Sequence, residues 1–210
     1  MTDDTRDRSL TDPADLESRP DTPDPQTPDD AAALRSVLDR TATLIDGVPA
    51  GTYGDATPCA DWTVERLLAH IVGWTEAFAD RAEGMDPAAD PDATAVDGDS
   101  GARFRTAAVR INAAEAADGP RPAKAADRGI LIAEYICHGT DLARATGQQV
   151  EYAETSGEIG LTALRGMLTP EYREYGFGPE VAVDPGAGAV PALLAFSGRS
   201  PADGSAGSAR

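Results

Sequence analysis

Histidine, cysteine and aromatic side chains are all scarce in this sequence of 210 residues. It contains two histidines, two cysteines and only 5% aromatic residues. Cys59 and Cys137 are too few to form a disulfide framework, which excludes the small disulfide-stabilised domains of secreted proteins. No apolar run approaches the ~20 residues that a helix needs to cross a bilayer. We therefore expect a protein that is not embedded in a membrane.

Positive charge is also scarce. Lys and Arg number 18 against 36 Asp and Glu, giving a formal net charge of -18. Nucleic acids and anionic membrane surfaces are bound by basic patches, so we expect neither as a partner. The N-terminus is acidic from Asp3 onward and lacks the apolar segment of a secretory signal. These features favour a cytoplasmic protein.

The charge is concentrated at the start of the chain. Residues 1–30 carry ten acidic and three basic residues, five prolines and no aromatic residue. Such a segment buries too little apolar surface to offset the entropy lost on ordering. We predict a disordered acidic tail over residues 1–29, a folded domain over 30–200 and a second disordered tail over 201–210.

Within the folded domain, apolar residues recur at helical spacing. The predicted helices cover about residues 30–48, 63–78, 102–117, 126–145, 157–168 and 190–196. Thr63 is predicted to cap the second helix and Gly147 to end the fourth. No segment alternates as a strand does, so the prediction is an all-α protein, a four-helix bundle with short C-terminal helical appendages.

One loop between these helices is strongly acidic. Residues 85–100 contain five aspartates and no basic residue. They lack the spacing and the terminal glutamate of a calcium-binding loop. We predict that this segment is a solvated linker.

The fourth predicted helix places Glu134 and His138 on one face, four residues apart, with Asp141 one turn further on. A carboxylate on a buried face is costly unless a partner compensates its charge. One solution adds His70 from the second helix, which makes the two histidines and one carboxylate of a catalytic zinc site, a set that also suits iron. The other solution is an ion pair with Arg66 or Arg128. The spacing alone is compatible with both.

Three segments resemble a known family. They are residues 57–73 (TPCADWTVERLLAHIVG), residues 134–147 (EYICHGTDLARATG), and residues 177–179 (FGP) followed by 193–199 (LLAFSGR). In this order they resemble the DinB-like metal-binding family of actinobacteria, which is related to the N-terminal domain of mycothiol-dependent maleylpyruvate isomerase. The resemblance covers about residues 30–200.

The resemblance implies that His70, Glu134 and His138 bind a divalent metal, most often Zn²⁺, with Fe²⁺ or Ni²⁺ as other candidates. Asp141 is then either an acceptor for a ligand histidine or a surface partner of Arg144. The implied activity is the metal-dependent activation of a low-molecular-weight thiol of the mycothiol type, as co-substrate, for transfer to an electrophile. A non-catalytic metal-binding or regulatory module is the alternative. With either function we expect a monomer or a homodimer.

Some residues depart from the family pattern. The chain is expected to lack the second domain of the isomerase, and Thr140 stands where relatives commonly carry tryptophan, so isomerase activity is not expected. Arg144 and Arg66 are the candidate cations for an acidic substrate or thiol. Cys59 is interpreted as a packed loop residue, with a thiolate at a helix N-terminus as the alternative. Cys137 is assigned to the buried core. Trp62, Trp74 and Tyr135 are assigned to the core or to a pocket wall.

Overall fold

The computed structural model describes residues 29–116, 125–173 and 177–200, and the terminal tails predicted from composition lie outside them apart from Asp29. The elements are α1 (Asp30–Asp46), α2 (Val64–Ala82), η2 (Pro91–Ala93), α3 (Ser100–Ala116), α4 (Ala125–Thr146), α5 (Glu154–Met167), α6 (Pro170–Arg173) and α7 (Ala189–Phe196). Among the described residues, strand-like pairing is limited to one bridge between Ala56 and Thr63. The all-α prediction is confirmed.

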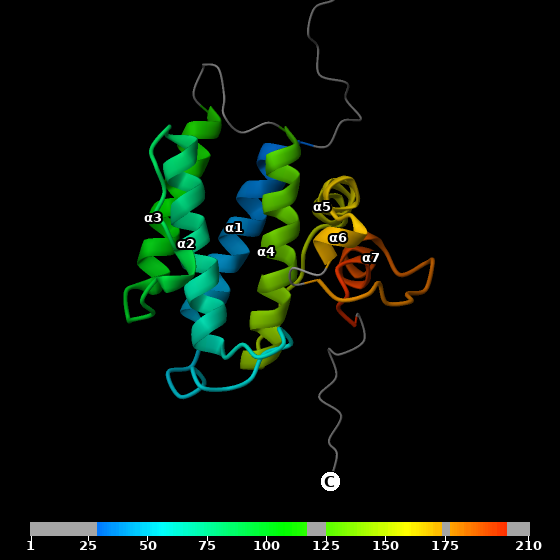
Figure 1. Ribbon diagram of the computed structural model, residues 1–210, viewed down its shortest axis with the longest axis horizontal. Helices are drawn as coiled ribbons and strands as arrows, with labels where there is room; N and C mark the ends of the chain where they lie inside the picture. Colours follow the sequence, from blue (N-terminus) through cyan, green and yellow to red (C-terminus); the bar gives the residue numbers. More distant parts are fainter. Residues whose placement is uncertain (1–28, 117–124, 174–176, 201–210) are drawn as a thin grey trace, which may run out of the picture.

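The first four helices run side by side as a bundle, and α5, α6 and α7 pack together beside α4 (Figure 1). The centre of the bundle is filled by fully buried apolar side chains from all four helices. The largest of these are Phe104, Leu34, Leu38, Leu67, Leu68, Ile132, Ile136 and Leu142. The predicted four-helix bundle with C-terminal helical appendages is thus the observed architecture.

The ends of the helices follow local capping chemistry. Asp29 accepts a hydrogen bond from the backbone N–H of Ala32 and caps α1. The hydroxyl of Thr63 accepts one from the N–H of Arg66, as predicted for the start of α2. Gly147 has a φ of +68°, a left-handed conformation that favours glycine, and it ends α4 as predicted.

The prediction of a solvated linker over residues 85–100 is wrong for its central part. Pro91 is buried, and the short helix η2 packs against α2. The sequence does not indicate this packing, because the segment consists mainly of small and acidic residues. It packs against a glycine of α2 rather than against an apolar stripe. Among the other appendages, α5 begins three residues earlier than predicted and α6 was not predicted.

None of the helices in the described residues combines the length and the apolar character that crossing a membrane requires.

Candidate metal centre

Three ligand-type side chains converge between α2 and α4. Oε1 of Glu134 lies 3.0 Å from Nε2 of His70 and 3.3 Å from Nε2 of His138. Ligand atoms placed about 2.1 Å from a tetrahedral zinc ion lie roughly 3.4 Å from one another. The structure therefore brings the three predicted residues together at a spacing that suits a metal. That they bind one stays a prediction.

Each histidine is held by an aspartate on its other ring nitrogen. Nδ1 of His70 lies 2.7 Å from Oδ1 of Asp92, and Nδ1 of His138 lies 3.3 Å from Oδ2 of Asp141. Carboxylates in this position hold the proton on Nδ1 and leave Nε2 as the ligand atom. Both rings therefore present the nitrogen that faces Glu134.

Asp92 is a site residue that the sequence did not reveal. It lies in η2, within the segment predicted to be a solvated linker, and its side chain also accepts a hydrogen bond from Nε1 of Trp74 at 3.0 Å. No sequence pattern distinguishes a site residue among the five aspartates of this acidic loop. Only the packing of this loop on α2 distinguishes Asp92 from its neighbours.

Asp141 is fully buried and paired with Arg199. Nε and Nη2 of Arg199 donate to Oδ2 of Asp141 at 2.9 and 2.7 Å. Burial disfavours the carboxylate, but His138 and Arg199 hold the pKa of Asp141 far below its usual range. The alternative of a surface pair with Arg144 is wrong, because Arg144 donates instead to the backbone oxygen of Ser200. Arg199 belongs to the closing segment of the family resemblance, yet its pairing with Asp141 was not predicted.

The pKa values at the centre favour a charged carboxylate. Burial opposes ionisation of Glu134, but the charges of His138, His70 and Arg199, with a hydrogen bond from His70, lower its pKa to about 2. Burial also opposes protonation of His70, but Glu134 and Asp92 outweigh it and raise the pKa of His70. Metals bind deprotonated ligands, so Glu134 is ionised and ready to bind at neutral pH, whereas protons compete more strongly with a metal at His70 because its pKa is raised.

Cys59, His138 and Asp141 form a second group of ligand-type side chains that shares His138. Sγ of Cys59 donates to Oδ2 of Asp141 at 3.1 Å, and burial together with Asp141 raises the pKa of this thiol to about 12. The predicted alternative of a thiolate is therefore wrong. A cation in this second group would have to displace the guanidinium of Arg199 from Asp141, so the set around Glu134 suits a metal better.

A cavity of about 630 Å³ opens beside the three predicted ligands. Trp62 forms one wall, with its ring centre 4.9 Å from that of His70 and 5.9 Å from that of His138. The other apolar lining side chains include Trp74, Phe78, Ile130 and Phe177. Trp62 and Trp74 are thus pocket walls, one of the two roles predicted for them. Cys137 and Tyr135 are buried in the core.

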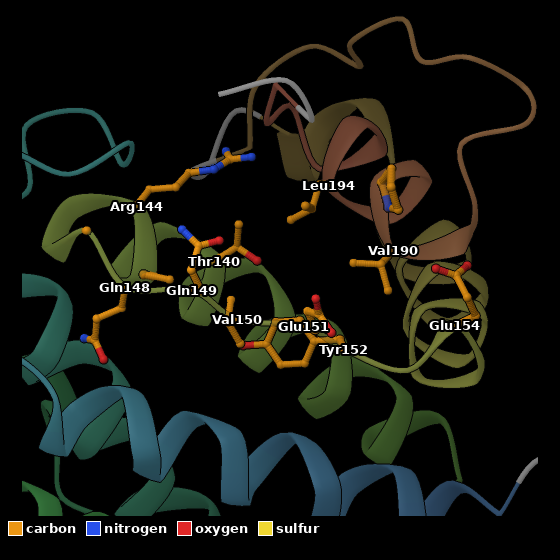
Figure 2. A pocket seen from close by; sticks show the side chains of 13 residues that line it. Thr140, Arg144, Gln148, Gln149, Val150, Glu151, Tyr152, Glu154, Val190 and Leu194 are labelled. Atoms are coloured by element: carbon orange, nitrogen blue, oxygen red, sulfur yellow. The ribbon is translucent and has the colours of Figure 1, made fainter. Parts of the chain in front are cut away.

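The two arginines predicted to face a substrate do not line this cavity. Arg66 lies against the Trp62 ring, with its guanidinium carbon 4.9 Å from the ring centre. Arg144 lines a second cavity of about 730 Å³ between the end of α4, the connector 147–153, the start of α5 and α7, as Figure 2 shows. Among the described residues that line the first cavity, the arginine is Arg199.

Comparisons with known proteins place this chain in a family. Two relatives are the uncharacterized protein MT0763 of Mycobacterium tuberculosis strain CDC 1551 and the uncharacterized protein Rv0738 of strain H37Rv. Each is 28% identical over 159 residues, covering 70% of this chain and 84% of the relative. No solved structure matches. Residues 34–143 match the family described as the mycothiol maleylpyruvate isomerase N-terminal domain.

The matched segment is shorter than the expected 30–200. It includes His70, Glu134 and His138, but it ends within α4 and so excludes Arg199. The family match therefore covers the predicted ligands and the bundle, while α5 to α7 lie beyond it. The chain belongs to the family of the mycothiol maleylpyruvate isomerase N-terminal domain, whose fold is DinB-like.

Proposed function

We propose that this protein is a metal-dependent enzyme that activates a low-molecular-weight thiol of the mycothiol type for transfer to an electrophile. His70, Glu134 and His138 would hold the metal, most often Zn²⁺ in such a ligand set. A divalent cation here would favour the thiolate form of a small thiol, the nucleophilic form. Family membership supports the thiol, and the convergence of the three ligand atoms supports the metal.

The observation that favours a catalytic over a non-catalytic function is the position of Cys59 and Asp141. Both side chains contact Nδ1 of His138, the ring nitrogen that points away from Glu134. Neither is placed to become a fourth ligand, which would close the centre. The three ligands border the 630 Å³ cavity, so a small molecule reaches the remaining coordination position from there.

Charge balance supports a thiolate as the fourth ligand. Two neutral histidines and one carboxylate around a divalent cation leave a single positive charge. One thiolate neutralises it, and a neutral centre is less costly to keep in a partly buried site than a charged one. The pair of Asp141 and Arg199 behind His138 is already neutral in sum and does not change this balance.

The protein residues have distinct roles in this proposal. Asp92 and Asp141 orient the two histidines, and Trp62 covers them and limits access of water. The apolar walls would hold the body of the electrophile next to the thiol. The proton of the thiol would leave through the open side of the cavity when the thiolate forms, before the sulfur attacks the electrophile.

The test begins with metal content. Wild type is expected to bind about one equivalent of zinc by elemental analysis, and Glu134→Gln and His138→Ala are expected to lose at least about tenfold in metal affinity, because each removes one of three ligands. Cobalt-loaded protein is then titrated with N-acetylcysteine, and a sulfur-to-cobalt charge-transfer band in the near ultraviolet is expected. N-acetylserine, the matched alcohol, should give no band.

Two results would overturn the proposal. If the wild type binds no zinc, the contacts between Glu134 and the histidines are hydrogen bonds and not part of a metal site. Metal binding without the thiol band would favour the second candidate function, a non-catalytic metal-binding or regulatory module. In that function the metal site is retained, but no thiol binds at the open coordination position of the metal.

A further inference from the structure

The segment Asp90–Thr94, here named the strap, crosses α2 at Gly73. A Cβ atom at Gly73 would overlap the carbonyl oxygen of Pro91 and the hydroxyl of Thr94. Glycine within a helix costs about 1 kcal/mol relative to alanine. In this helix the glycine makes room for the strap, whose backbone lies directly on the backbone of α2.

This close approach sets the position of Asp92. Its Oδ1 receives hydrogen bonds from two donors one turn apart on α2, Nδ1 of His70 at 2.7 Å and Nε1 of Trp74 at 3.0 Å. Asp90 accepts a hydrogen bond from the backbone N–H of Asp92 and holds the turn. The side chain of Asp92 is nevertheless 53% exposed, so burial alone does not account for its place.

We infer that Asp92 is the positioning residue of His70. Gly73 allows the strap to approach α2 closely enough to place Asp92 beside His70. The inference rests on the proposed metal centre. A carboxylate on the far ring nitrogen of a ligand histidine fixes the tautomer and the ring orientation and makes the ligand nitrogen more basic. Asp92 thus determines how well Nε2 of His70 meets the metal, although it does not bind the metal itself.

The experiment measures zinc dissociation constants by competition with a chromophoric chelator. Loss of such an outer carboxylate weakens metal binding by about 10- to 100-fold, and we expect a weakening in this range for Asp92→Ala. Asp92→Asn keeps an acceptor for both donors and is expected to retain most of the affinity. Asp86→Ala removes the same charge from an exposed position of the same connector and is expected to leave the dissociation constant unchanged.

Gly73→Ala tests the strap itself. The added methyl group meets strap atoms rather than the bundle core, so the fold should persist while Asp92 is displaced. We expect a loss of zinc affinity like that of Asp92→Ala, with an unchanged helical circular dichroism spectrum. Because both substitutions remove one and the same contact, the double variant should be no weaker than either single variant.

A second readout separates this inference from the proposed function. In metal-free protein at a pH where the ring of His70 is neutral, ¹⁵N NMR of the imidazole rings reports whether Nδ1 or Nε2 carries the proton. We expect Nδ1–H in the wild type and loss of that preference in Asp92→Ala and Gly73→Ala.

If zinc binds but Asp92→Ala retains wild-type affinity, or if the losses of the two single variants simply add, the positioning role is refuted and the metal centre stands. If zinc does not bind at all, the proposed function fails. In that case a His70 tautomer that is unchanged in Asp92→Ala and Gly73→Ala would refute the positioning role as well.

Discussion

At the scale of single residues, Asp141 and Arg199 form the most deeply buried ion pair described at the site. The side chain of Asp141 is 0% exposed and that of Arg199 is 13% exposed. Removing two charges from water is costly, and a buried pair offsets this cost only through its own contacts. The pair therefore holds His138 in place but adds little net stability compared with apolar side chains of the same size.

Removing one partner of this pair should be far more damaging than removing both. We expect Asp141→Asn to lower the free energy of unfolding by about 3–5 kcal/mol, because it leaves a buried guanidinium without its counter-charge. The double variant Asp141→Leu with Arg199→Met should recover a large part of that loss. Urea unfolding of the metal-free protein, followed by circular dichroism, measures both. Equal losses in the single and the double variant would contradict this account.

At the scale of elements, α5 joins the bundle through glycines. A Cβ at Gly157 would lie 2.6 Å from the backbone nitrogen of Val190, at the start of α7. At Gly160 it would lie 3.2 Å from the backbone of Ala133 in α4. Glycine at these positions lets three helices approach closely, and this approach places α7 and the following Arg199 beside α4.

Two glycines of α5 provide a matched pair of substitutions. Gly166→Ala meets no atom within 4 Å and is expected to raise the free energy of unfolding by about 0.5–1 kcal/mol, the gain in helix propensity. Gly157→Ala makes the same gain but forces α7 away, so we expect a net loss of about 1–3 kcal/mol, as for other overpacked contacts. Thermal unfolding of the two variants tests the difference. Stabilisation by both would show that α7 is not held against Gly157.

At the scale of the whole molecule, the proposed metal centre would link α2 to α4 and should couple metal binding to global stability. A ligand at about 100 times its dissociation constant stabilises the native state by roughly 2.7 kcal/mol. We expect zinc to raise the melting temperature of the wild type and to have no such effect on Glu134→Gln. Calorimetry with zinc and with chelator makes the comparison.

The pH dependence should have opposite signs with and without metal. The pKa of His70 is raised in the folded state, so its protonated form stabilises the metal-free protein below the unfolded value of about 6.5, and this contribution is lost as the pH rises through the raised pKa. Protons compete with the metal for the same ring, so the stabilisation by zinc should grow over this range. Calorimetry at a series of pH values between about 6 and 8.5 tests both slopes. Parallel slopes with and without zinc would contradict a metal bound to His70.

Much of the architecture followed from local patterns along the chain. Helical spacing of apolar residues predicted the bundle, and Thr63 and Gly147 marked the ends of helices because capping and left-handed backbone depend on neighbouring residues alone. Resemblance to a family pointed to His70, Glu134 and His138, and the structure brings these three together.

The partners of these residues were decided by tertiary structure. Asp92 is 22 residues from His70 in the sequence, and Arg199 is 58 residues from Asp141. Neither contact follows from a periodic pattern, because each depends on how a connector or a C-terminal helix packs against a glycine. The sequence by itself determined the helices, since these rest on short-range spacing, and its resemblance to a family pointed to the candidate ligands. Which side chains orient those ligands, and where the cavity opens, was decided only by contacts between distant segments.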